Sequence, residues 1–241
     1  MPPEFVMLLV IVGCPALSIA ISLYRSVRAM LRFPEVQEDV DSSADFVDGL
    51  PKAYRPLLVS KCFQFANAYA FHSIRFGVWV QVNSAPPLRY FSILRSQLGG
   101  AETYEFITVF TDTVSLTTTT TRSAFVHPRC FGNFLQAFPG YTPEGLWAAH
   151  LTGEEHLTAA AGISAKACQL PFLERLKQGI IRDASHVTSF PLWFVRGIYW
   201  YSCKRFLLHN KPIWRQNIKK LYRAYARDGA GSLDQRQFPC A

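Results

Sequence analysis

An uncharged run near the N-terminus constrains this 241-residue chain more than any other feature. Residues 5–24 read FVMLLVIVGCPALSIAISLY, and Arg25, Arg28 and Arg32 follow directly. A transmembrane helix needs about 20 predominantly apolar residues to cross a hydrocarbon core of about 30 Å. We therefore expect residues 1–33 to form a membrane anchor and the rest of the chain to form a tethered domain.

Two other signals compete for the same run. A cleaved secretory signal carries basic residues before its apolar core, but positions 1–4 here read MPPE. Residues 11–14 (IVGC) also resemble the signal of a bacterial lipoprotein, with Cys14 as the lipidated residue. Apolar sequence continues well past Cys14, however, where a lipoprotein normally turns polar. The anchor is the favoured interpretation.

The charges that flank the run predict its orientation. Basic residues lie beyond its C-terminal end, and none precedes it. Positive residues close to a membrane span stay in the cytoplasm. The expected topology is therefore single-pass, with the N-terminus outside and the main domain cytoplasmic.

The composition fits a chain whose surface is partly covered by lipid or by partner proteins. Charged residues make up 17% of the sequence, against about 25% in ordinary soluble domains. The net charge of +8 is uneven, because residues 1–121 hold nine Lys/Arg and ten Asp/Glu, whereas residues 122–241 hold sixteen and seven. A polyanionic partner is therefore expected at the C-terminal half.

The six cysteines indicate neither a disulfide framework nor a zinc site. They are scattered without a CxxC pair or a regular spacing. This usage is typical of a reducing compartment.

The middle of the chain predicts an α+β domain over residues 51–186, after an acidic linker at 34–50. Residues 34–48 hold six acidic residues and no basic one, which is typical of a solvated spacer. A short helix is expected at 52–61. An antiparallel meander is then expected at about 63–121, because β-branched and aromatic residues recur between short turns. Its predicted strands are 68–74, 77–82, 89–94, 104–110 and 114–121.

Helices are expected over about 143–182. Thr142, Pro143 and Glu144 form a helix start, which predicts a helix at 143–161 with a break available at Gly153. A second helix is expected at 170–182. The run Thr117–Thr121 is interpreted as a polar strand, and its alternative is a set of hydroxyls that bind a ligand.

The C-terminal segment, 187–241, is basic and aromatic. Residues 190–208 are apolar nearly all round a helical wheel but include three basic residues, so an interfacial or re-entrant segment fits better than a second span. Residues 214–227 predict a basic amphipathic helix. Nine basic residues and no acidic one occur from Arg196 to Arg227. The region is expected to contact anionic lipid headgroups; packing on its own domain stays open, and nucleic-acid binding is disfavoured.

Only one group of residues resembles a chemical centre. His150, Glu154 and His156 are metal-ligand types, but their order is not that of a zinc hydrolase. On a helix His150 and Glu154 share a face, whereas His156 points elsewhere. His72 and His127 are isolated, and the GxSxG, P-loop and GxGxxG motifs are absent from the sequence. We assign no catalytic, cofactor-binding or metal-binding residue.

The expected function is therefore non-catalytic: a membrane-anchored accessory or interaction subunit that binds an unidentified membrane protein. The main alternative is a membrane-associated enzyme, with or without a metal ion, centred on His150, Glu154 and His156. The weaker alternative is a nucleic-acid-binding protein that uses the basic C-terminal region.

Overall fold

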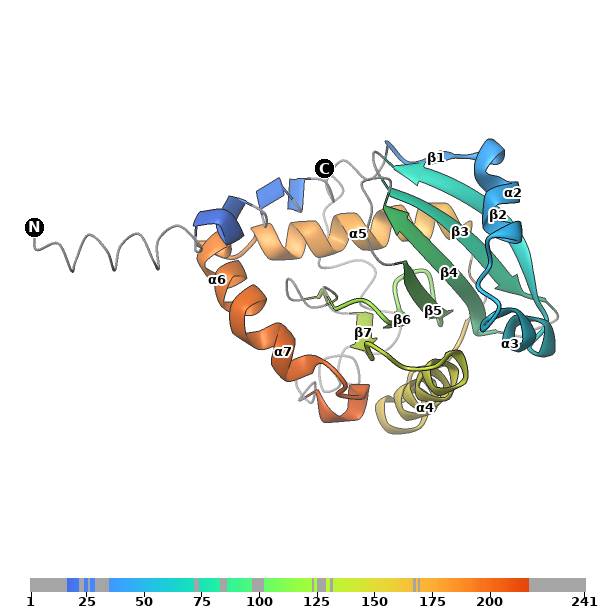
Figure 1. The fold of residues 1–241 in the computed structure, drawn as a ribbon. Coiled ribbons are helices and arrows are strands. Elements are labelled where there is room, and N and C mark those ends of the chain that lie inside the picture. Colours follow the sequence, from blue (N-terminus) through green and yellow to red (C-terminus); the bar gives the residue numbers. More distant parts are fainter. Residues whose placement is uncertain are drawn as a thin grey trace, which may run out of the picture.

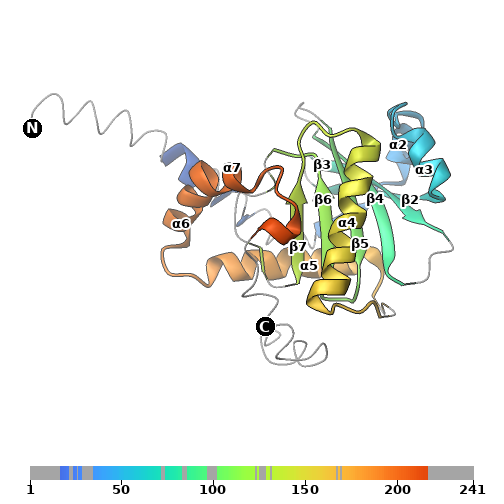
Figure 2. The same ribbon diagram turned by 90° about the horizontal axis from the view of Figure 1, so that it is seen from below.

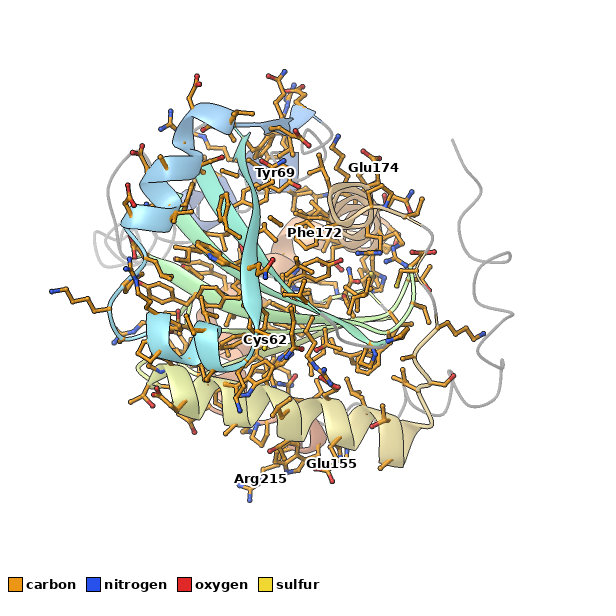
Figure 3. The ribbon with its side chains drawn as sticks, turned by 90° about the vertical axis from the view of Figure 1, so that its right-hand side faces the viewer. Cys62, Tyr69, Glu155, Phe172, Glu174 and Arg215 are labelled. Atoms are coloured by element: carbon orange, nitrogen blue, oxygen red, sulfur yellow. The ribbon has the colours of Figure 1, made fainter. Side chains whose placement is uncertain are left out.

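A computed structural model describes residues 17–21, 24–25, 27–28, 35–71, 74–82, 86–96, 102–122, 124, 129–130, 132–166, 168 and 170–216. A seven-stranded sheet lies between two long helices (Figures 1 and 3). Helix α4 (Pro143–Ala161) covers one face and α5 (Phe172–Thr188) covers the other. The fold is α+β, as the sequence predicts.

The sheet is a meander whose strands lie side by side in chain order. Every neighbouring pair is antiparallel except the last, in which β7 runs parallel to β6. The strands are β1 (Gln37–Glu38), β2 (Phe63–Phe71), β3 (Ile74–Gln81), β4 (Leu88–Ser96), β5 (Thr103–Val109), β6 (Ser115–Thr119) and β7 (Asn133–Ala137). The predicted antiparallel meander is thus confirmed for β2 to β6, and β1 and β7 extend it on both sides.

One predicted strand boundary is wrong. The expected strand at 68–74 spans the end of β2 and the first residue of β3, which pair as a hairpin with Phe71 opposite Ile74. Both strands are rich in aromatic residues, so composition alone did not reveal where one ends and the next begins.

The acidic segment is part of the folded domain, which corrects the expectation of a solvated linker. Within 34–50, β1 pairs with β2, and a 3₁₀ turn (Val40–Ser42) leads into α2 (Ser43–Asp48). Val36 and Phe46 are buried. The Phe46 ring packs directly on Gly77, since a Cβ on that glycine would lie only 2.7 Å from the ring. Two apolar residues among six acidic ones are enough to anchor the segment, because Phe46 packs against Gly77 and Val36 packs in the cluster that contains Tyr69 and Phe76.

The two faces of the sheet bury different side chains. On the α4 face, Phe91, Phe106 and Trp147 form the main core together with residues of α2 and α3 (Arg55–Ser60). On the α5 face, Tyr90 and Val109 pack with Phe172 and Leu176. Successive residues of β4 and β5 point to opposite faces of the sheet, so each strand contributes side chains to both cores.

Helix α4 begins and ends as predicted, and the break expected as an option at Gly153 does not occur. The Thr142 hydroxyl accepts a hydrogen bond from the Gly145 N–H, and the helix ends at Gly162, whose φ is +67°. A Cβ at Gly153 would lie 2.7 Å from the Gln136 amide nitrogen. The glycine therefore allows close contact between helix and sheet.

The described part of the C-terminal segment, up to residue 216, is largely helical and lies at one end of the sheet, beside β7 (Figure 2). Helix α6 (Trp193–Tyr199) continues through a π-helical turn (Trp200–Lys204) into α7 (Arg205–Leu208), and a 3₁₀ turn follows at Ile213–Arg215. Leu208 packs on Ala124, Leu135 and Ala137. Most of the amphipathic helix expected at 214–227 lies outside the described residues.

No helix among the described residues is both long and apolar enough to cross a bilayer. Most of the uncharged run at 5–24 lies outside those residues, since only 17–21 and 24 belong to them.

Candidate functional site

The most enclosed polar group lies between α4 and the sheet. His150 and Glu154 occupy successive turns of α4 and point into the same layer, as their spacing predicts. The His150 ring contacts two hydroxyls, at 2.8 Å from Nε2 to Thr108 Oγ1 and 2.8 Å from Nδ1 to Thr118 Oγ1. The Thr108 hydroxyl lies 2.9 Å from Glu154 Oε2, and Arg89 forms an ion pair with the same carboxylate.

The partners fix the direction of each hydrogen bond in this cluster. Thr108 donates to the Glu154 carboxylate, so its oxygen accepts from His150 Nε2–H. The Thr118 oxygen accepts from the Gln136 amide at 2.8 Å, so its hydroxyl donates to His150 Nδ1. The cluster therefore runs as one chain of donors from Gln136 to Glu154 and holds the imidazole in its Nε2–H form.

Burial, reinforced by the nearby Arg89 charge, lowers the pKa of His150 to about 3. The ring is therefore neutral near pH 7, and both of its nitrogens are already in hydrogen bonds. Gln136 is equally occupied, because its amide group donates to the Ala149 carbonyl and accepts from the Ile213 N–H. A cluster with these properties orders the interior but offers a substrate no free group.

His156, the third residue of the sequence motif, does not join the other two. Its ring lies 5.7 Å from that of Trp214, on another side of α4. Within the part of the chain that the structure describes, no three His, Cys, Asp or Glu residues lie close enough together to hold a metal ion. His72 and His127 lie outside the described residues.

A cavity of about 260 Å³ lies on the other face, between the sheet and α5. Figure 3 shows α5, marked by Phe172 and Glu174, on the opposite side of the sheet from α4. One half of its wall is apolar and comes from β3, β4, β5 and α5; its members include Ile74, Phe76, Leu94, Ile107, Val109, Phe172 and Leu176. The other half is polar, and its residues come from β5, β6, the segments before β6 and β7, and α5.

Arg129 and Asp183 form the fixed part of the polar half. Arg129 Nη1 lies 2.7 Å from Asp183 Oδ2, and the Cys130 N–H donates to Asp183 Oδ1 at 2.9 Å. Although burial alone would raise the pKa of Asp183, the Arg129 charge and these hydrogen bonds hold it below its usual range. Burial and the Asp183 charge raise the pKa of the Cys130 thiol, so Cys130 is not an activated nucleophile.

Two more arginines approach the cavity from α5. Arg175 and Arg182 are two helical turns apart, and both line the cavity. Arg175 donates to the Leu170 carbonyl and the Tyr90 hydroxyl, and Arg182 donates to the Thr113 carbonyl at 3.2 Å. The Nε–H groups of Arg129, Arg175 and Arg182 are all buried and have no hydrogen-bond partner among the residues that the structure describes.

Glu105 completes the polar half from β5. Its carboxylate accepts a hydrogen bond from Thr119, its partner on β6. Enclosure raises the pKa of Glu105, and the Thr119 hydrogen bond and the Arg129 charge only partly oppose this. The threonine run thus divides between the faces: Thr117 and Thr119 line the cavity, while Thr118 binds His150.

Sequence reasoning found the α4 cluster but missed the cavity. The available signal was the spacing of Arg175 and Arg182 at i and i+7 on a helix whose same face carries Phe172, Leu176 and Gly179. The alternation within Thr117–Thr121 was the second signal. Neither signal showed that these arginines of α5 and these threonines of β6 would face each other.

Comparisons with known proteins do not place the chain in a family: no family model, no curated protein and no solved structure matches it.

Proposed function

We propose that this chain is a non-catalytic accessory subunit, anchored in a membrane by residues 5–24, that holds its α+β domain against the cytoplasmic face and binds a membrane protein there. The apolar run and the arginines that follow it motivate the anchor and the orientation.

The observation that carries the proposal is the contact between the end of the apolar run and the aromatic C-terminal segment. Val27 is buried in a small cluster with Ala184, Val187 and Trp193. The rings of Tyr24 and Trp193 stack with 6.5 Å between their centres. The place where a span would leave the bilayer is therefore packed against α5 and α6.

Large apolar side chains remain exposed on the segments that meet here. They come from residues 17–24 and from 192–207, at the left end of Figure 1: Leu17, Ile21, Tyr24, Leu192, Val195, Tyr199, Phe206 and Leu207. Soluble surfaces seldom expose so many apolar residues in neighbouring segments. A bilayer would cover them, and we call this group the apolar end.

Basic residues accompany the apolar end, as a headgroup layer requires. Arg25, Arg28, Arg196, Lys211 and Arg215 are exposed, and the described residues of 17–28 and 190–216 include no acidic side chain. Each such charge contributes about 1 kcal/mol close to an anionic surface.

The state of the His150 cluster supports a non-catalytic role. An enzyme built on His150 and Glu154 would need at least one of these groups to reach substrate. His150 is fully buried and Glu154 is 7% exposed, and every polar atom of the imidazole has a partner inside the protein. The enzyme alternative therefore loses its best centre.

Two exposed cysteines provide the test. Cys62 lies near the start of β2, far from the apolar end, while Cys203 lies in the π-helical turn within it. Cells producing the full chain would be treated with a membrane-impermeant maleimide, and labelled peptides would be mapped by mass spectrometry. We expect neither cysteine to react in intact cells, Cys62 alone to react in opened membranes, and both to react in detergent.

Three results would contradict the proposal: labelling of Cys62 on intact cells, equal labelling of both cysteines in opened membranes, or recovery of the chain in the soluble fraction. As a matched control, Phe206→Asp should expose Cys203 to the reagent without changing Cys62. Purification in mild detergent then tests the accessory role, which predicts a co-purifying membrane protein in fixed proportion.

A further inference from the structure

We propose that the cavity between the sheet and α5 binds a single-chain monocarboxylate, with the apolar tail between β3–β5 and α5 and the carboxylate at Arg182. This inference goes beyond the proposed function and does not depend on the membrane anchor.

The cavity has the size and the walls for an alkyl tail. An engineered apolar cavity of about 150 Å³ takes up benzene, so a cavity of about 260 Å³ has room for a longer apolar group. Its apolar half is made of aliphatic and aromatic side chains from both the sheet and the helix. Ligand pockets commonly combine such walls with a few converging polar groups.

Three arginine donors at the cavity have no hydrogen-bond acceptor among the described residues. A buried donor without a partner destabilises the folded protein, and three guanidinium Nε–H groups around one cavity are in this state. The Arg175 side chain is only 6% exposed, so water from outside does not readily satisfy it. A carboxylate or phosphate oxygen is the acceptor that a guanidinium group binds best.

The ion pairs around the cavity indicate where an anionic headgroup would bind. Arg129 forms an ion pair with Asp183, and Arg175 lies 3.8 Å from Asp112. Arg182 has no acidic partner among the residues that the structure describes. Arg182 is therefore the arginine at which an anionic headgroup can bind without displacing an ion pair. A carboxylate brings one negative charge into the cavity, whereas a phosphate monoester brings nearly two.

Glu105 lies in the same half of the cavity, where enclosure raises the pKa of its carboxyl. A raised pKa lessens the repulsion between Glu105 and a bound carboxylate. Thr117, which also lines this half, adds a hydroxyl donor.

Gly179 opens space where the ligand would lie. It is in the middle of α5, lines the cavity and would meet only Asn133, at 3.6 Å, if it carried a Cβ. A glycine in mid-helix lowers helix stability, so a larger side chain here would favour α5 while filling the cavity. Gly179→Leu therefore blocks the site without relying on a destabilised protein.

The experiment measures binding to the full chain in lipid nanodiscs. Labelled decanoate would be followed by equilibrium dialysis and corrected with empty discs, and decylamine and decanol would serve as probes with the same tail and another headgroup. Wild type would be compared with Arg182→Met, with Gly179→Leu, and with Lys177→Met, which removes a charge from the same helix outside the cavity.

We expect saturable decanoate binding that Arg182→Met weakens by at least about tenfold, that Gly179→Leu abolishes and that Lys177→Met leaves within about twofold. Affinity should rise by about fourfold for each added methylene from hexanoate until the cavity is full. Absence of binding, binding unaffected by both cavity variants, or a preference for decylamine would overturn the proposal.

Discussion

The two faces of this sheet differ in how their polar side chains are hydrogen-bonded. On the α4 face, His150, Thr108 and Glu154 form a closed chain in which each donor meets an acceptor. On the α5 face, three arginines keep unpartnered Nε–H groups around a cavity. His150 and Glu154, which resembled a chemical centre in the sequence, are thus enclosed and fully hydrogen-bonded, and the face that we propose to bind a ligand is the other one.

The largest effect is expected from opening the closed network. Glu154→Ala leaves Arg89 without its carboxylate and removes the acceptor of the Thr108 hydroxyl. Breaking a buried pair from one side costs about 3–5 kcal/mol, reduced here because 22% of the Arg89 side chain is exposed. We expect the free energy of unfolding to fall by about 2–4 kcal/mol, measured by urea denaturation. A loss below about 1 kcal/mol would mean that the network does not stabilise the fold.

Acid should lower the stability of the folded protein through His150, which lies in the same network. Its pKa is about 3 in the folded protein and near 6.5 when unfolded, so between these values the unfolded chain binds the extra proton. The His150 contribution to stability is therefore complete above about pH 6.5 and is lost as the pH falls toward 3.

Urea titrations from pH 7 to pH 4 would measure this loss, with His150→Gln as the control because an amide supplies a donor and an acceptor without titrating. We expect a steeper fall in wild type, by up to about 1 kcal/mol per pH unit. Equal slopes would show that the imidazole is not held neutral.

Two glycines, one in each long helix, allow a matched comparison of the faces. A Cβ at Gly153 would stand 2.7 Å from the Gln136 amide, whereas one at Gly179 would meet Asn133 at an ordinary 3.6 Å. We expect Gly153→Ala to destabilise the protein by about 1–2 kcal/mol through overpacking, and Gly179→Ala to stabilise it by about 0.5–1 kcal/mol through helix propensity. Thermal unfolding of the two variants measures both stability changes. Changes of the same sign would contradict the expected difference between the two faces.

The smallest expected effect concerns Glu105 on the cavity face. Since enclosure raises its pKa, Glu105 favours folding at low pH and opposes it at neutral pH. Glu105→Gln should therefore stabilise the protein slightly at pH 7, and the gain should shrink as the pH approaches the unfolded value of 4.5. Denaturation at both pH values measures the difference, and a gain that grows toward acid would contradict it.

Local sequence patterns predicted where helices and strands lie better than they predicted which elements contact one another. The start of α4 at Thr142, and strands β4 to β6 to within about two residues at each end, followed from capping and alternation. The linker prediction failed because Phe46 packs on Gly77, a contact between residues 31 positions apart in the sequence that composition does not record. The cavity was missed for the same reason, since Arg129 and Arg182 come to line one cavity only after the sheet and α5 have packed.

Ligand-induced stabilisation tests most directly which face binds. The unfolding temperature of the full chain in nanodiscs would be measured with and without decanoate for wild type, His150→Gln and Arg182→Met. A ligand that binds only the folded state raises stability by about 2.7 kcal/mol at a hundred times its dissociation constant. We predict that decanoate raises the unfolding temperature of wild type and His150→Gln but not of Arg182→Met. A shift that disappears with His150→Gln and persists in Arg182→Met, or no shift in wild type, would contradict the assignment of binding to the α5 face.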